Sequence, residues 1–250
     1  MSVYGARVSN PTTGVLVLSS EASGLYCIGR ASLLGSVVQA SGLVTSPNPG
    51  RIAGHSTYRI AHAGPIIAAV DLPANRRVGI NSVTQSSPGV WDIEVYSGSQ
   101  ATDAEGFSTQ SEVAVWAYGL VSAAPSGWGG VIRRADGSIA YDLTRANPLF
   151  PRASVMLGPG YGSDTTILVL TRPVMLGTPT SYSINDILSG GANTRAVVTT
   201  RETWLRDGTT LFLVSSTRQQ YRYFSPSAIV GDDNEVTVAT GFLIEGAGLP

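Results

Sequence analysis

Short stretches of alternating apolar and polar residues recur along this chain, and they constrain its fold more than any other feature. In the clearest one, Trp91, Ile93 and Val95 fall on one face, whereas Asp92 and Glu94 fall on the other. A period of two residues is the geometry of a β-strand with one buried face. Similar alternation, or a short apolar run in the same setting, occurs at 15–18, 113–118, 166–171, 210–214 and 235–240.

Turn residues bound these stretches, and helical patterns are scarce. The Asp136-Gly137 and Asp207-Gly208 pairs predict hairpins with tight primed turns, because both residue types tolerate positive φ. The best helical candidate is 183–189, where Ser183 can cap the first turn and a Gly pair follows the last. We therefore predict an all-β, sandwich-like fold with very little helix.

The middle of the chain contains the best candidate for a domain boundary. Residues 122–127 are small or polar and include Pro and Gly, so they predict a linker between an N-terminal β-domain (1–121) and a C-terminal β-domain (128–250). An aromatic-Gly pair, a strand, a polar turn and a second strand occur at the start of both halves. Duplication of one domain explains this echo, and chance similarity of two hairpins explains it equally well.

Composition excludes several classes of protein. A hydrophobic content of 43% argues against disorder, and charged residues make up only 13% of the 250 residues. Lysine is absent and the net charge is -1, so the chain has no basic stripe for nucleic acid. The basic doublets are Arg76-Arg77 and Arg133-Arg134, and the second is typical of a solvated hairpin edge.

The chain also has few signals for secretion, membrane insertion or disulfide bonding. Residues 1–5 have no basic start followed by an apolar core, so they predict no signal peptide. No apolar run reaches the roughly 20 residues that cross a bilayer. Cys27 is the single cysteine and is interpreted as an inert, buried thiol. We expect folding in a cytoplasm.

Residues with catalytic or metal-binding chemistry do not form a recognisable pattern. His55 and His62 are seven positions apart, which places them on opposite faces of a strand, so we predict no metal site. The sequence around Ser56 lacks the second glycine of a nucleophile elbow. Asp92 and Glu94 could serve a glycoside hydrolase, but outward polar positions of a half-buried strand explain them better. We expect no enzyme activity and no cofactor.

Aromatic side chains are the remaining candidates for contacts. Trp91 and Trp116 lie on strand faces and are interpreted as core. Four others lie near loops or strand ends and are candidate surface contacts, with half-buried packing as the alternative: Trp128, Tyr161, Tyr221 and Tyr223.

The first hairpin carries a resemblance to a known group of proteins. Tyr4-Gly5, the strand that ends at Asn10, a Gly turn and the apolar run 14–19 resemble the start of tail-tip and tail-fibre-associated proteins of long-tailed bacteriophages. The segments 130–142, 65–70, 91–96 and 113–118 resemble the later layout of the same group. The resemblance covers about half of the chain, and the part after Tyr161 has no counterpart.

The resemblance implies a structural protein of the virion, located at the tail tip or baseplate and made in the bacterial cytoplasm. It implies assembly with itself, as a trimer, and with other tail proteins, and it assigns no catalytic residue. Low charge fits a surface that neighbouring subunits cover. The alternative is a tail-fibre module that binds a host receptor, either a surface glycan or a pilus. A glycan-cleaving enzyme is a more distant third hypothesis.

Overall fold

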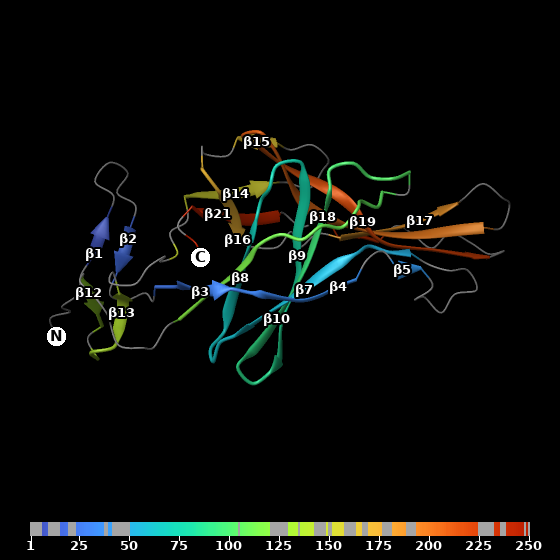
Figure 1. Cartoon of the computed structure of the whole chain (residues 1–250). Helices are drawn as coiled ribbons and strands as arrows, with labels where there is room; N and C mark the ends of the chain where they lie inside the picture. Colours follow the sequence, from blue (N-terminus) through green and yellow to red (C-terminus); the bar gives the residue numbers. More distant parts are fainter. Residues whose placement is uncertain are drawn as a thin grey trace.

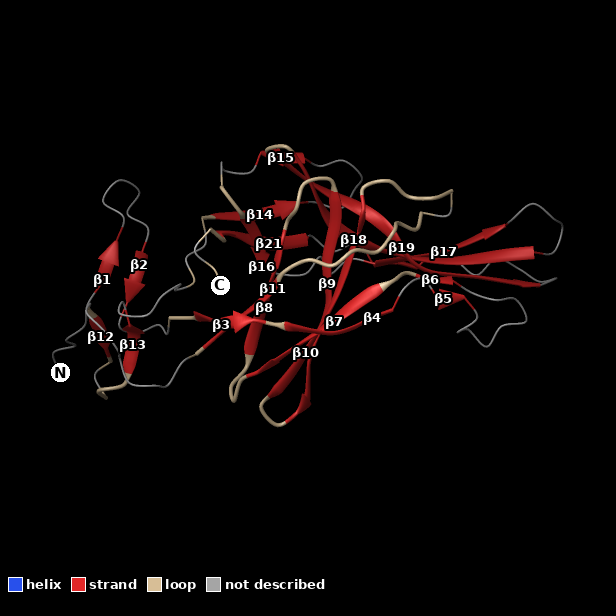
Figure 2. Cartoon of the chain, in the orientation of Figure 1, coloured by secondary structure: helices blue, strands red, loops and turns tan. Residues whose placement is uncertain are grey.

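The structure is a computed structural model of the chain, shown in Figure 1. It describes residues 7–9, 16–19, 24–37, 40–41, 51–104, 106–120, 130–134, 136–142, 149, 152–157, 164–166, 170–176, 182–188, 194–224, 233–235, 239–247 and 249. Within these ranges all regular structure is β-strand and no helix occurs (Figure 2). The predicted all-β class is confirmed.

The described strands form two large antiparallel sheets and two separate hairpins. The eleven-stranded sheet contains β4 (Ser32–Val37), β5 (Ala40–Ser41), β6 (Arg51–Ile52), β7 (His55–Ala61), β9 (Arg76–Ser87), β10 (Val90–Ser99), β15 (Asp164–Thr166), β17 (Tyr182–Leu188), β18 (Thr194–Asp207), β19 (Thr210–Phe224) and β20 (Asp233–Glu235). The six-stranded sheet contains β3 (Tyr26–Arg30), β8 (Ile66–Asp71), β11 (Val115–Gly119), β14 (Ala153–Leu157), β16 (Pro173–Leu176) and β21 (Ala239–Glu245). The hairpins are β1 (Arg7–Ser9) with β2 (Leu16–Ser19), and β12 (Val131–Arg133) with β13 (Ile139–Asp142).

The main path through the large sheet runs β4-β7-β10-β9-β18-β19-β6-β5. The long hairpin β18–β19 extends away from the rest of the molecule in Figure 1 and also pairs with β17 and β15. The smaller sheet has the order β14-β21-β16-β8-β11-β3. Strand β4 is therefore at one end of the large sheet, and β3 is at one end of the small sheet.

One stretch of chain passes directly from the small sheet to the large one. Strand β3 pairs with β11, and after Ala31 the chain continues as β4, which pairs with β7. The Ala31 amide still bonds the Val115 carbonyl at 2.8 Å, so this residue is the point at which the two sheets diverge. This divergence positions the cleft described below.

The main hydrophobic core lies between the two sheets, which gives the sandwich-like arrangement. Ile93 and Val95 of β10 are fully buried there, together with Val70, Val115 and Trp204 from neighbouring strands. Burial of each such side chain stabilises the fold by roughly 1.5–3 kcal/mol. Alternation along β10 places its inward residues in this core, as the sequence predicts.

A second cluster of buried side chains lies on the opposite face of the small sheet. Trp116 is fully buried in this cluster and Val174 packs with it. The core position predicted for Trp116 is confirmed, whereas Trp91 is half-buried and donates its indole N–H to the His62 carbonyl at 3.0 Å.

The short helix predicted at 183–189 is wrong. These residues belong to β17, which pairs along its whole length with β18 and over its first three residues with β20. One or two helical turns have a costly nucleus and little hydrogen bonding to offset it. The adjacent long strand supplies a complete ladder of partners, and this pairing prevails over the local capping signal.

Two further predicted strands are correct only in part. In the segment 166–171, strand β15 ends at Thr166 and residues 170–171 are outside any strand. In the segment 235–240, strand β20 ends at Glu235 and β21 begins at Ala239. Residues 167–169 and 236–238 are outside the described residues.

The two Asp-Gly turns differ from each other. Positive φ occurs at Gly137 (84°) but not at Asp136, so the primed turn predicted there is wrong. The Gly137 amide bonds the Arg134 carbonyl and the Arg134 amide bonds the Ser138 carbonyl, which is the pattern of a turn closed by a glycine bulge. At the other turn, Gly208 (φ 56°) is the first of two central residues, as in a primed turn.

Strand pairing connects the two halves of the chain. Strand β8 pairs with β16, and β9 pairs with β18, so each large sheet contains strands from both sides of residues 122–127. Of the linker predicted there, all residues are outside the described part of the chain.

Candidate functional site

A cleft opens where the two large sheets diverge. Its volume is about 780 Å³, and residues from β3, β4, β7, β8, β9 and the segment before β16 line it. Its polar lining consists of three guanidinium groups, two carboxylates and a phenol: Arg30, Arg76, Arg172, Asp71, Glu112 and Tyr58. We call this site the arginine cleft.

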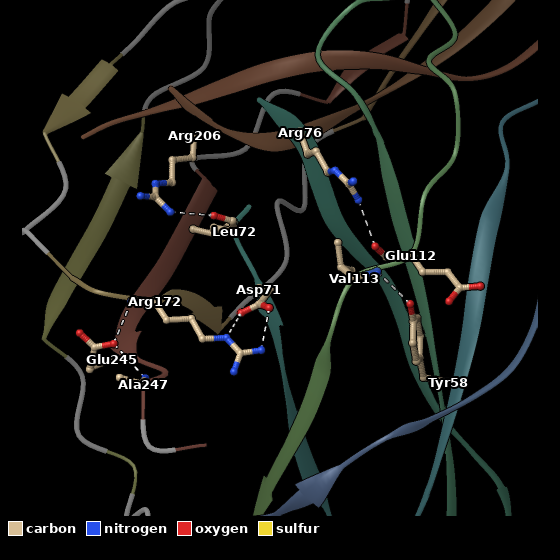
Figure 3. Close-up of polar contacts among 10 residues, drawn as sticks. All are labelled: Tyr58, Asp71, Leu72, Arg76, Glu112, Val113, Arg172, Arg206, Glu245 and Ala247. Atoms are coloured by element: carbon tan, nitrogen blue, oxygen red, sulfur yellow. Dashed lines mark hydrogen bonds and ion pairs between the residues drawn. The ribbon is translucent and has the colours of Figure 1, made fainter. Parts of the chain in front are cut away.

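Arg172 forms a fixed, electrically neutral part of the wall. Its Nε and Nη2 donate to the two carboxylate oxygens of Asp71, each at 3.0 Å (Figure 3). The same guanidinium stacks 4.5 Å from the centroid of the Trp116 ring. Glu245 holds the backbone beneath it, because its carboxylate accepts hydrogen bonds from the amides of Thr171 and Arg172.

Arg76 uses only part of its hydrogen-bonding capacity. Its Nη1 donates to the Ser111 hydroxyl at 2.9 Å and to the Glu112 carbonyl at 3.1 Å (Figure 3). The described residues offer no hydrogen-bond partner to its Nε or Nη2. The side chain is thus oriented by one nitrogen while the others are free to bind a ligand.

Tyr58 contributes a buried hydroxyl. It is 4% exposed, and its oxygen accepts a hydrogen bond from the Val113 amide at 3.2 Å. Burial raises the pKa of the Tyr58 phenol, so the group keeps its proton at neutral pH. The Ser56 side chain also hydrogen-bonds the Tyr58 hydroxyl, so two protein groups hold it in the wall of the cleft.

Arg30 and Glu112 complete the charged lining. Arg30 ends β3 and is exposed, and Glu112 is an exposed residue just before β11. Neither side chain has a hydrogen bond or ion pair to any described residue. The Asp71 carboxylate neutralises Arg172, so Arg30 and Arg76 face one unpaired carboxylate. The described lining residues therefore carry a single excess positive charge.

The edge strand β4 lies directly beside this cleft. All six of its residues are exposed, and no strand pairs with its outer edge among the described residues. Three large apolar side chains are exposed along it: Leu33 at 41%, Leu34 at 55% and Val37 at 42%. Because Leu33 also lines the cleft, the apolar edge and the arginine cleft form one continuous surface.

The carboxylates considered for glycoside hydrolysis have other partners. Arg59 donates to both oxygens of Asp92, at 2.7 and 2.8 Å, and this pairing lowers the pKa of Asp92. Glu94 accepts a hydrogen bond from Asn81 and is 3.7 Å from His55. A catalytic acid needs a raised pKa, so the environment of Asp92 favours the opposite state.

The aromatic residues predicted as surface contacts can be placed only in part. Trp128 and Tyr161 are outside the described residues. Tyr221 and Tyr223 lie on β19, where they pair with Val197 and Arg195.

Metal-ion clusters and membrane-spanning helices are two further features to consider in the described part of the chain. No group of three or more His, Cys, Asp or Glu residues is arranged to hold a metal ion. No helix in the described ranges is long and apolar enough to cross a membrane.

Comparison of the chain with protein-family models, curated proteins and solved structures gives no match. The function therefore has to be inferred from the site itself.

Proposed function

We propose that this chain acts by assembly, as a structural protein of a bacteriophage tail tip or baseplate that contacts copies of itself and other tail proteins. The observation that supports assembly is the edge strand β4. It exposes three large apolar side chains, and it has no charged residue and no proline. In natural proteins, a sheet edge that must not pair with another strand usually carries a charged residue or a proline, or another segment covers it. The phage setting comes from the resemblance of the first hairpin.

Strand β4 offers both parts of an interface. Its outer edge supplies backbone N–H and C=O groups for a further strand, and its apolar side chains supply surface to bury. In the proposed assembly, β4 packs against a different surface of the next copy, and three copies close a ring.

The test is the mass of the purified protein in solution, measured by light scattering during size-exclusion chromatography. We expect three times the chain mass for the wild type and a single chain mass for Leu34→Glu. Phe242→Glu is the matched control, because Phe242 is also a large exposed apolar residue (49%) but is located on β21. A monomeric wild type contradicts self-assembly. Dissociation by Phe242→Glu but not by Leu34→Glu contradicts the role of β4.

A host-receptor-binding role is favoured by a different observation, the excess positive charge of the arginine cleft. Clefts of roughly 300–1,000 Å³ are typical of sites for small ligands. The test is binding of the labelled protein to immobilised bacterial surface glycans, with Arg30→Gln as the variant. Binding that Arg30→Gln leaves unchanged contradicts a receptor role for this cleft.

A further inference from the structure

We propose that the arginine cleft binds a small hydroxylated monocarboxylate, of which uronic acids are the simplest cyclic examples. For its role in vivo this inference rests on the receptor-binding alternative. The binding itself is a property of the purified chain and does not depend on assembly through β4. The two proposals can therefore fail separately.

The charge of the cleft selects a monoanion. Arg172 and Asp71 neutralise each other through two hydrogen bonds of 3.0 Å. The remaining groups, Arg30 and Arg76 against Glu112, leave one excess positive charge. A ligand with one negative charge balances it, whereas a dianion would leave one excess negative charge beside the Glu112 carboxylate.

The guanidinium N–H groups that have no described partner suit a carboxylate ligand. Arg30 has no partner among the described residues, and Arg76 is anchored through Nη1 alone. A guanidinium presents two parallel N–H groups that match two oxygens of a carboxylate or of a phosphate. The described part of the cleft also lacks the usual features of a phosphate site, because none of the described lining residues is a glycine and no described helix points into it.

The other lining groups fit hydroxyls and a carbon ring. The Glu112 carboxylate can accept a hydrogen bond from a ligand hydroxyl, and Tyr58 lines the cleft as an aromatic surface for a ring. Apolar contacts come from residues on both sheets and from the segments between them: Ala31, Leu33, Pro73, Val113 and Ala114. A charged group at one end and a mixed polar and apolar body describe a sugar acid better than they describe a simple inorganic ion.

The experiment is a titration of the full chain with two sugars that differ only in the carboxylate. Glucuronate and glucose are added separately to isotopically labelled protein, and amide shifts are followed by NMR at neutral pH. We expect saturable shifts with glucuronate at residues 30–33, 58, 76 and 112–114, and at least about tenfold weaker binding of glucose. Inorganic phosphate and a short acidic peptide are added as competing probes.

Variants assign the binding to the named residues. Arg30→Gln and Arg76→Gln should each weaken glucuronate binding about tenfold or more, because each removes charged hydrogen bonds. Glu112→Gln should tighten it by about two- to fivefold, since it removes a like charge. Arg152→Gln is the matched control, because Arg152 is an exposed arginine outside the cleft, and it should leave binding unchanged. If Arg76→Gln fails to fold, Arg30→Gln alone tests the proposal, because Arg30 is exposed.

Several results would overturn the proposal. Equal binding of glucose and glucuronate would remove the role of the carboxylate. Unchanged glucuronate binding in Arg30→Gln would remove the role of the cleft's free charge. Tighter binding of phosphate would assign the cleft to phosphate instead, and binding of the peptide alone would assign it to an acidic protein segment.

Discussion

Two regions of this molecule contain the same kinds of side chain but differ in how deeply these side chains are buried and in how many hydrogen-bond partners they have. The arginine cleft combines guanidinium groups, carboxylates and Tyr58. The second region, which we call the Tyr96 cluster, lies on the face of the large sheet turned away from the main core and contains Tyr96, Ser108, Asn81, Arg201, Glu94 and His55. In the cleft, Arg30 is exposed and has no partner among the residues that the structure describes. In the cluster, Arg201 is 8% exposed and stacks 3.9 Å from the Tyr96 ring centroid.

Hydrogen bonds connect most members of the Tyr96 cluster. Arg201 donates to the Asn81 side-chain oxygen, the Asn81 amide donates to Glu94, and the Tyr96 hydroxyl hydrogen-bonds Ser108. Removal of one member leaves its partners buried without a hydrogen bond. The comparison therefore teaches that residue type alone does not define a binding site here: a buried, hydrogen-bonded cluster stabilises the fold, and an exposed one with free donors can bind a ligand.

The largest expected effect is the loss of Arg201. Arg201→Met removes the stacking on Tyr96 and leaves the Asn81 oxygen without its donor, so we expect a loss of about 2–3 kcal/mol in the free energy of unfolding. Arg30→Met changes the same residue type at an exposed position and should cost less than about 0.5 kcal/mol. Urea unfolding of both variants measures the difference. Equal losses would show that the two regions do not differ as argued.

A smaller effect is expected from two glycines. A Cβ on Gly98 would overlap the Ser108 hydroxyl and lie 2.7 Å from that of Tyr96, so Gly98→Ala should cost about 1–3 kcal/mol. A Cβ on Gly35 in β4 would meet nothing within 4 Å, so Gly35→Ala should be neutral or stabilising by a few tenths of a kcal/mol. Thermal unfolding of both variants distinguishes them. A loss at Gly35 as large as that at Gly98 would mean that β4 is not open.

The sequence predicts where strands lie along the chain better than it predicts which strands pair with each other. Alternation at 91–96 identifies β10 because inward and outward positions are a property of the strand itself. The helix predicted at 183–189 fails because its alternative, a ladder with β18, is formed by residues farther along the chain. The turn at Asp136 fails for a related reason, because the bulge beside it is a property of two paired strands.

A single sequence contains almost no pattern that predicts the arginine cleft. Its charged residues come from separate elements, and only the folding of β3 into β4 brings Arg30 near Tyr58 and Glu112. The Arg76-Arg77 doublet marks the place, yet Arg77 points elsewhere and donates to the Gln100 carbonyl and the Ser216 hydroxyl. The uncharged run 32–37 is the one local signal, since an edge strand without charge is a candidate interface.

A third prediction concerns Asp71, whose charge neutralises Arg172 in the wall of the cleft. Asp71→Asn removes the charge that neutralises Arg172, so the cleft gains a second excess positive charge. We expect inorganic phosphate to bind at least about threefold more tightly than to the wild type, because a dianion is then balanced. The partly exposed ion pair itself should contribute about 1 kcal/mol or less to stability. Phosphate titration followed by NMR checks the first point, and unchanged phosphate affinity would contradict the charge assignment of the cleft.

The smallest expected effect concerns Glu245, which holds the backbone that carries Arg172. Its carboxylate accepts hydrogen bonds from the amides of Thr171 (2.9 Å), Arg172 (3.0 Å) and Ala247 (2.9 Å). Burial acts to raise the pKa of Glu245, but the backbone hydrogen bonds outweigh it and hold this pKa below the ordinary value of 4.5. The ionised form is therefore favoured by folding, so its contribution is fully present above about pH 4.5 and is lost as the pH falls through the lowered pKa.

Glu245→Gln should remove this contribution, which solvent screening limits to about 0.5 kcal/mol. Urea unfolding of the wild type and Glu245→Gln at a series of pH values measures it. The difference in free energy of unfolding should be constant from neutral pH to about pH 5 and should shrink at lower pH. Glu94→Gln, in the Tyr96 cluster, is the companion variant at a carboxylate that does not touch the cleft. If the Glu245→Gln difference grew as the pH fell, the carboxylate would not be stabilised by these amides, and Arg172 would be positioned by Asp71 alone.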